Sequence, residues 1–277
     1  MKKLSVLIAV LLAGVNGFAS PQAGKYFDHI IIVIFENTDY ADAMAQPFFK
    51  QLADSGANFS SMLALAHPSQ GNYIALASGD LNGVKDDGKH DVDVKNVVDL
   101  LEAKGLTWKV YAEDYPGNCY TGSKSGGYVR KHNPFISFLD IQKDPTRCAK
   151  IVNADQFDSD SANGTLPNYV FYIPNMDNDG HDTGVGYADK WYSGKFGPFL
   201  ADARLMANTI LLSTFDESGG GSPNQIYTSI VGPMVKAIDL GSNYAIPSLL
   251  RLVEDNWDLG DLGKKDHTAE PVQGIWK

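Results

Sequence analysis

The segment His29-Ile-Ile-Ile-Val-Ile-Phe35 decides the fold class of this 277-residue chain. After His29 it is entirely apolar and mostly β-branched, with no alternation of apolar and polar positions. A strand of this kind is buried on both faces, which is typical of parallel strands in the middle of an α/β sheet. The segments 169–173 and 209–215 have the same character, and we expect them in the same sheet.

Helical segments alternate with these strands along the chain. Three expected helices end at glycines, as helices commonly do. The expected helices are 47–55, 69–78, 94–104, 188–206 and 247–257, and two further strands are expected at 107–112 and 225–231. This alternation predicts an α/β domain with a largely parallel central sheet and helices on both faces. No linker interrupts it, so we expect one domain over residues 20–277.

The N-terminal segment has the features of a secretory signal peptide. Lys2 and Lys3 precede an apolar run, and Gly17 and Ala19 are the small residues expected before a cleavage site. The run is shorter than the about 20 apolar residues that span a bilayer. We therefore expect residues 1–19 to be removed and the mature chain to be secreted, periplasmic or extracellular, without stable membrane insertion.

The chain has two cysteines, Cys119 and Cys148. Both lie in the stretch 115–168, which is rich in Gly, Ser, Asn, Asp and Lys, and which we expect to be an irregular insertion. In an exported chain two cysteines favour one disulfide. It would close a loop of about 30 residues and add about 3 kcal/mol of stability. Two buried thiols are the alternative.

The chain is acidic, with 33 Asp+Glu against 23 Lys+Arg and a formal charge of −10. Loss of residues 1–19, which hold two lysines and no acid, makes the charge −12. Nucleic-acid phosphates need cationic surfaces, so we expect no nucleic-acid partner. A small phosphate ester can still bind where a metal cation supplies local positive charge. The composition leaves the oligomeric state open.

Polar side chains follow the expected strands at their carboxyl ends, where ligands bind in open α/β sheets. These residues are Glu36, Asn37, Asp216, Glu217 and the acidic stretch 175–182. Carboxylates grouped in this way raise one another's pKa, and a bound divalent cation removes the repulsion. Oxygen ligands with one or two histidines therefore predict a divalent metal site at this edge.

Ser69 opens the helix expected at 69–78, where free backbone N–H groups and the helix dipole favour phosphate. A metal beside its hydroxyl would make it a nucleophile. Each feature alone has an ordinary explanation, because Ser69 could be a helix cap and the acid pairs could be solvated turns.

Two other kinds of site match parts of the sequence. The stretch from Asn175 fits the opening of an EF-hand loop, but its twelfth position is Gly186 instead of Glu. A Ser-His-Asp hydrolase using His67 and Ser69 is a further alternative.

Six segments, in this order, carry a family resemblance. They are Phe35-Glu-Asn-Thr-Asp-Tyr40, His67-Pro-Ser-Gln-Gly-Asn-Tyr73, Tyr128-Val-Arg-Lys-His-Asn-Pro-Phe135, Pro174-Asn-Met-Asp-Asn-Asp-Gly-His-Asp182, Thr214-Phe-Asp-Glu217 and Ser248-Leu-Leu-Arg-Leu-Val-Glu-Asp-Asn-Trp257. They resemble the bacterial and fungal phosphoesterases, a family of acid phosphatases and phosphatidylcholine-type phospholipases C in the alkaline-phosphatase-like superfamily. The resemblance covers nearly the whole mature chain and implies an alkaline-phosphatase-like fold.

The resemblance also implies roles for residues at matching positions. Ser69 would be the nucleophile, and His181 would contact phosphate or protonate the leaving group. The ligands of one divalent metal ion would be Glu36, Asn37, Ser69, Asp216 and Glu217, and the residues around the substrate would be His67, Asn72, Lys131 and His132.

A second metal ion is less well supported by the resemblance. Asp177 and His181 resemble the second-metal segment of broader superfamily members. Relatives often carry a histidine before the last helix, where this chain reads Tyr244-Ala-Ile-Pro-Ser248. His267 is the candidate replacement. The departure favours a single ion and leaves room for altered activity.

Three functions are compatible with these residues. The leading one is a secreted metal-dependent acid phosphatase that hydrolyses phosphate monoesters through a phosphoserine, with an acidic optimum because His181 would act as an acid. The second is a phosphodiesterase of the phospholipase C type. The third is a non-catalytic phosphate- or metal-binding relative, which the missing histidine motivates.

Overall fold

The computed structural model describes residues 23–221, 223–241 and 243–277. The predicted signal peptide, residues 1–19, lies outside these residues and stays a prediction. Within the described ranges, no helix combines the length and the apolar character needed to cross a bilayer.

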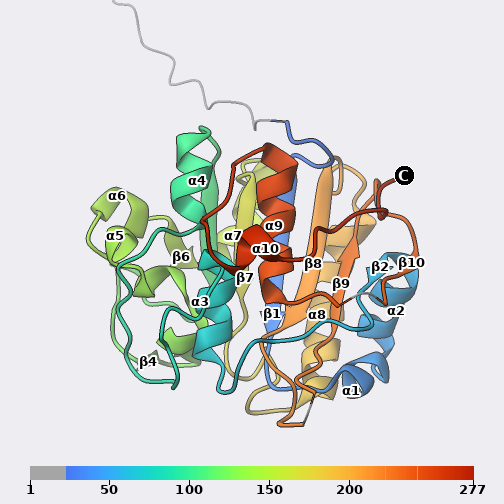
Figure 1. The fold of residues 1–277 in the computed structure, drawn as a ribbon, viewed down its shortest axis with the longest axis horizontal. Coiled ribbons are helices and arrows are strands. Elements are labelled where there is room, and N and C mark those ends of the chain that lie inside the picture. Colours follow the sequence, from blue (N-terminus) through green and yellow to red (C-terminus); the bar gives the residue numbers. More distant parts are fainter. Residues whose placement is uncertain (1–22, 222, 242) are drawn as a thin grey trace, which may run out of the picture.

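A mostly parallel sheet forms the centre of the described chain, with β1 (His29–Phe35) in its middle (Figure 1). β1 pairs in parallel with β7 (Tyr169–Ile173) on one side and β8 (Thr209–Phe215) on the other. Its six residues after His29 are buried, as the apolar sequence requires. The full strand order is β10 (Ile238–Asp239), β2 (Ala57–Asn58), β9 (Thr228–Val231), β8, β1, β7, β3 (Trp108–Ala112) and β6 (Ile151–Asn153). The predicted fold class is confirmed.

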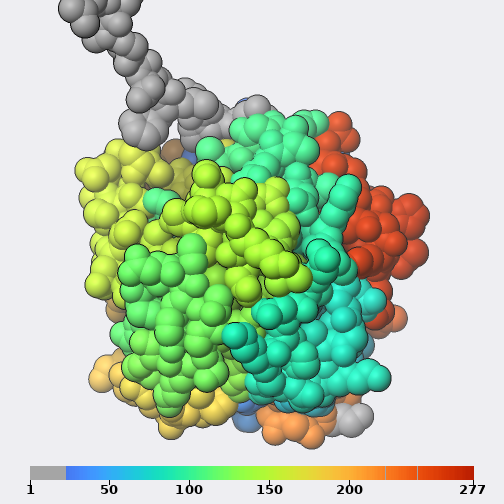
Figure 2. Space-filling view, turned by 90° about the vertical axis from the view of Figure 1, so that its left-hand side faces the viewer, coloured from blue at the N-terminus to red at the C-terminus, as the bar shows by residue number. Residues whose placement is uncertain are grey.

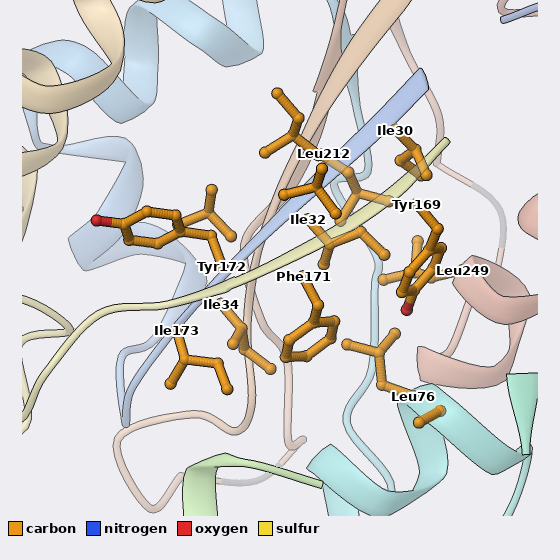
Figure 3. Packing of buried hydrophobic residues seen from close by; sticks show 14 of the residues in the cluster. Ile30, Ile32, Ile34, Leu76, Tyr169, Phe171, Tyr172, Ile173, Leu212 and Leu249 are labelled. Carbon is orange, nitrogen blue, oxygen red and sulfur yellow. The ribbon is translucent and has the colours of Figure 1, made fainter. Parts of the chain in front are cut away.

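Helices cover both faces of this sheet (Figure 1). One face carries α3 (Gln70–Ser78), α4 (Val97–Ala103) and α9 (Ile246–Trp257), and the other carries α2 (Pro47–Ser55), α7 (Asp155–Asn163) and α8 (Val185–Ala201). Figure 3 shows Leu76 of α3 and Leu249 of α9 beside Phe171, while Tyr172 points to the opposite side of the sheet. There Tyr172 packs edge-on against Phe196 of α8. Successive residues of each buried strand therefore pack into two separate apolar layers, one on each face of the sheet.

The predicted elements agree closely with the structure, although the helix expected at 188–206 spans Val185–Ala201 and two other elements begin later than expected. The helix expected at 94–104 begins only at Val97, because the Asn96 side chain accepts a hydrogen bond from Val98 N and Asp99 closes the reciprocal bond. This capping box sets the start of the helix. The strand expected at 225–231 is shorter, since β9 begins at Thr228.

The stretch 115–168 contains the predicted disulfide between Cys119 and Cys148. The stretch is less irregular than we expected. β6 adds to the edge of the central sheet beside β3, and Phe157 of α7 packs on Tyr111. The polar composition of the stretch suggested a loop, but burial of its apolar side chains stabilises regular structure there. The short elements of this stretch are β4 (Lys124–Ser125), β5 (Tyr128–Val129), 3₁₀ turns at Arg130–His132 and Phe135–Ser137, α5 (Leu139–Gln142) and α6 (Pro145–Cys148).

Two short helices complete the described chain. α1 (Tyr40–Met44) follows the end of β1, and α10 (Lys265–Thr268) packs against α9. The α10 segment reaches the C-terminal end of α3, where Lys265 N donates to Gly79 O at 3.2 Å. Gly79 has a φ of 77°, in the left-handed region that ends a helix.

Glu254 of α9 gives the fold a testable pH dependence. Burial and the neighbouring Asp266 raise its pKa from 4.5 to about 9. The folded protein therefore keeps a proton that the unfolded chain has released, so stability should fall as pH rises between these values, by at most about 1.4 kcal/mol per pH unit. Glu254→Gln should remove this slope and be more stable than wild type at about pH 8 in urea unfolding. The exposed control Glu270→Gln should keep it; a wild-type slope in Glu254→Gln would contradict the assignment.

Candidate active site

The register of β1 on β8 brings two acidic strand ends together. Phe35 pairs with Phe215, so the residues that follow, Glu36-Asn37 and Asp216-Glu217, leave the sheet side by side. The Asn37 backbone N–H donates to Asp216 Oδ1 at 3.1 Å. Asn37 has a φ of 48°, a left-handed conformation that Asn tolerates better than most residues. This turn holds both acid pairs at the carboxyl edge of the sheet.

Ser69 joins these acids from the start of α3. Its hydroxyl donates to Glu36 Oε2 at 3.1 Å and lies 3.3 Å from Glu217 Oε1. Only 1% of Ser69 is exposed. Three segments that are far apart in the sequence therefore meet around one hydroxyl oxygen, as the predicted site requires.

Asn72 supports the turn before Ser69. Its Oδ1 accepts from the backbone N–H groups of Leu65 and Ala66, and its Nδ2 donates to Ala66 O. Because the side chain is fully buried, these bonds satisfy its polar atoms. We expected Asn72 beside the phosphate. In the structure its side chain instead stabilises the loop at Leu65 and Ala66, which precedes Ser69.

His132 lies between two buried carboxylates. Its Nε2 is 2.9 Å from Glu36 Oε1 and its Nδ1 is 3.1 Å from Asp179 Oδ2. The ring stacks on Tyr73, whose hydroxyl donates to Glu36 Oε1 at 2.8 Å. Burial opposes the charge of His132, but Glu36 and Asp179 raise its pKa to about 10. Burial likewise opposes the charge of Glu36, yet His132 and Tyr73 lower its pKa to about 2. The two form a charged pair.

The pKa values of Asp216 and Glu217 are raised, whereas that of Glu36 is lowered. Burial, together with the charges of Glu36 and Glu217, holds the pKa of Asp216 well above its usual range. Burial also raises the pKa of Glu217, against the effect of His67, whose Nδ1 is 2.8 Å from Glu217 Oε2. Among the described residues, Asp216 Oδ2 is buried without a hydrogen-bond partner. Three crowded carboxylates, one with an unpaired oxygen, form an environment that a cation would stabilise.

The donor set fits a hard divalent cation in its chemistry. Carboxylate, amide and hydroxyl oxygens are the ligands that such ions prefer. In the described part of the chain, however, no three His, Cys, Asp or Glu side chains are arranged to hold one ion together. Glu36 and Glu217 instead contact Ser69 and a histidine each, and Asp216 accepts from the Asn37 backbone N–H. The ligand set Glu36, Asn37, Ser69, Asp216 and Glu217 is therefore a proposal that rests on the donors and on the unpaired oxygen.

His181 lies at the edge of the same cluster. Its ring centroid is 6.1 Å from that of His132, and its Nδ1 is 2.7 Å from Asp182 Oδ1. Asp177 is exposed and forms no ion pair with His181 within the described residues. The structure thus brings His181 to the site without pairing it with Asp177, and it adds no support for a second metal ion.

His267, the candidate replacement for the histidine that the resemblance leads us to expect, does not reach the site. His267 is exposed on α10 and is paired with Asp261 at 2.9 Å. α10 contacts the end of α3 that is opposite to Ser69. His267 therefore lies away from the site.

Tyr73 was not expected at the site, and Asp179 was expected only as part of the acidic stretch 175–182, without its contact to His132. Asp179 also binds its own segment, because its Oδ1 accepts from His181 N at 2.8 Å. Tyr73 follows Ser69 by four residues, so one face of α3 carries both. That spacing was the available signal for Tyr73, whereas the pairing of Asp179 with His132 depends on long-range packing.

Comparisons with known proteins identify the family of this chain. The sequence matches the description "Phosphoesterase family" over residues 38–260. The chain belongs to the phosphoesterase family. This phosphoesterase is 36% identical to a probable acid phosphatase from Kluyveromyces lactis, over 92% of its own chain and 64% of the relative. It is 32% identical to a phosphatidylinositol-3-phosphatase from Mycobacterium tuberculosis, over 99% of its own chain and 92% of the relative.

The length and the fold of these proteins add two facts. The phosphoesterase chain spans less than two thirds of the length of the fungal relatives it matches, 64% for K. lactis and 59% for Aspergillus fumigatus. A crystal structure in the alkaline phosphatase superfamily, from Vibrio parahaemolyticus, superposes with a TM-score of 0.63 at 12% identity, covering 91% of this chain and 72% of that one. This likeness confirms the predicted alkaline-phosphatase-like fold.

Proposed function

We propose that this phosphoesterase is an exported, metal-dependent acid phosphatase that hydrolyses phosphate monoesters through a phosphoserine on Ser69. The observation that carries the proposal is the position of the Ser69 hydroxyl, at the start of α3 and within 3.3 Å of both Glu36 and Glu217. A buried serine that donates to carboxylates at a helix N-terminus is suited to attack a phosphorus atom, since the helix end favours the anion.

The chain's own residues provide the steps. Glu36 and Glu217 orient the hydroxyl, and Glu217, whose raised pKa makes it the better base of the two, takes the hydroxyl proton. The serine oxygen forms the new bond to phosphorus while the bond to the leaving oxygen breaks on the opposite side. His181 donates a proton to that leaving oxygen. Water then attacks the phosphoserine and gives a proton to His181, the bond between phosphorus and the Ser69 oxygen breaks, and Glu217 returns the proton to Ser69 as phosphate departs. A divalent cation at the acid cluster would supply positive charge to the phosphoryl group and favour ionisation of the serine hydroxyl.

His132 and Lys131 support substrate binding in this proposal. His132 holds Glu36 in place through the contacts described above. Lys131 extends from the same 3₁₀ turn, and its ammonium group is suited to a phosphoryl oxygen. His67 orients Glu217 through its ion pair. These roles are positioning and binding, whereas Ser69 and His181 contact the reacting atoms.

A lipid-linked monoester is the second candidate substrate. It is favoured by the M. tuberculosis relative, which is named a phosphatidylinositol-3-phosphatase and matches nearly end to end. Both candidates break a monoester bond at the same site, so they differ in the group that leaves.

A substrate panel tests the proposal. Protein of measured metal content is assayed from about pH 4 to about pH 9 with p-nitrophenyl phosphate, phosphatidylinositol 3-phosphate and phosphatidylcholine. We expect turnover of a monoester, with a maximum on the acidic side. Exclusive cleavage of phosphatidylcholine would assign a phosphodiesterase. Phosphate binding without turnover of any ester, across several metals, would assign a non-catalytic relative.

A further inference from the structure

The carboxylate of Asp87 lies at the start of α3, the helix that follows Ser69. Its Oδ1 accepts from the backbone N–H of Gln70, the residue after Ser69, at 3.0 Å. Its Oδ2 accepts from Lys131 Nζ at 2.8 Å. The same carboxylate thus occupies the first N–H group of α3 and the lysine proposed for substrate binding. A phosphoryl group that enters the site would seek these two donors.

Lys131 links this contact to the acid cluster. Burial lowers the pKa of Lys131, but Asp87, Glu36 and Asp216 outweigh it and raise the pKa. The ammonium group is therefore charged and lies within the field of the site acids. Its side chain is 19% exposed and that of Asp87 is 29% exposed. A partly buried ion pair with solvent access can be replaced by an incoming anion, whereas a fully enclosed one cannot.

The loop around Asp87 is anchored independently of the carboxylate. With its amide nitrogen turned toward the loop, buried Gln70 donates to Gly88 O at 2.7 Å and Asp86 O at 3.2 Å. Asp86 accepts from Gly88 N and pairs with His90. The Asp87 side chain can therefore rotate away while the backbone stays in place. Figure 2 shows the segment around residues 80–95 at the surface, beside the green segment that follows it.

We propose that the Asp87 carboxylate competes with the phosphoryl group for the Lys131 ammonium group and the Gln70 backbone N–H. It thereby sets the affinity of the site for substrate and for released phosphate. This inference rests on the proposed function, since it concerns the same site. Its consequence is weaker product inhibition: each phosphate that leaves is replaced by the carboxylate. Asp87 is a residue that tunes specificity for anions and takes no part in bond breaking.

The test compares Asp87→Asn with Asp86→Asn, which removes an equal charge from the adjacent, more exposed residue, whose side chain contacts His90 and Gly88 N instead of Lys131 or the Gln70 backbone N–H. The metal-loaded full-length proteins are assayed with p-nitrophenyl phosphate, and inorganic phosphate is the inhibitor. Asp87→Asn should lower both KM and the inhibition constant of phosphate by roughly tenfold, from the loss of one nearby negative charge. Asp86→Asn should change either by less than about twofold, because solvent screens it.

A double-mutant cycle separates competition from loop support. In a Lys131→Met background, the effect of Asp87→Asn should shrink to about threefold or less, since one of its two donors is gone. Thermal unfolding accompanies each variant, and Asp87→Ser replaces Asp87→Asn if the latter fails to fold. Unchanged or raised KM and phosphate inhibition constant in a folded Asp87 variant would overturn the inference. If wild type turns over no ester, the proposed function fails, and calorimetric phosphate binding still tests Asp87 by the same tenfold gain.

Discussion

Ser69→Ala should lower kcat by about 10⁴-fold or more while leaving the fold intact, because removal of a nucleophile abolishes the covalent route. The Ser69 hydroxyl lies within 3.3 Å of both Glu36 and Glu217 and is suited to form the bond to phosphorus. Its loss removes one proposed metal ligand but leaves the acid cluster in place, so thermal unfolding should stay near wild type, and the metal content of both proteins is measured so that rates are compared at equal occupancy. The measurement is the initial rate on the best monoester of the panel.

Ser78→Ala is the matched control for this change. Ser78 lies at the other end of α3, is equally buried, and donates its hydroxyl hydrogen to Ile74 O. Its removal should affect stability by about 1 kcal/mol and leave kcat unchanged. Activity that persists in highly purified Ser69→Ala would refute Ser69 as the nucleophile. A trapped phosphoserine in wild type, absent from Ser69→Ala, would add direct support.

Removal of the divalent cation that we propose at the acid cluster should have the second largest effect. After chelation we expect activity to fall by about 10²-fold or more, with recovery on addition of a divalent ion. The unfolding temperature should fall as well, since a ligand that binds only the folded state stabilises it. The physical reason lies in the crowding of Glu36, Asp216 and Glu217, because burial and the charges of the two glutamates disfavour the ionised form of Asp216 unless a cation is bound.

Proton release provides a readout of the same cation that is independent of turnover. Burial and its acidic neighbours hold the pKa of Asp216 well above its usual range, so the cation-free protein keeps a proton there that a ligating carboxylate must lose. Cation binding should therefore release protons and tighten as pH rises, which calorimetry in buffers of different ionisation enthalpy detects. Asp216→Asn should lose most of the gain in unfolding temperature. Full activity in protein shown to be metal-free would contradict the prediction.

Local sequence was enough to predict much of the fold and the two acid pairs. The strand 29–35 could be placed in the sheet centre because a continuous apolar run has no polar face to expose. Glu36 and Asp216 could be placed together because parallel strands end at the same edge. By contrast, β6 was missed, since three residues in a polar stretch carry too weak a pattern to distinguish an edge strand from a loop.

The site likewise combines features that the local sequence predicts with contacts that only the folded chain forms. That Ser69 begins a helix, and that acids follow the neighbouring strands, was determined by the sequence itself, because helix ends and strand ends are specified by residues a few positions away. The pairing of His132 with Glu36 and Asp179, and the seating of Asp87 on Lys131, were decided only by the tertiary structure. These contacts join segments between 44 and 96 residues apart, and what selects them is the need of buried charges to find partners once the chain has folded.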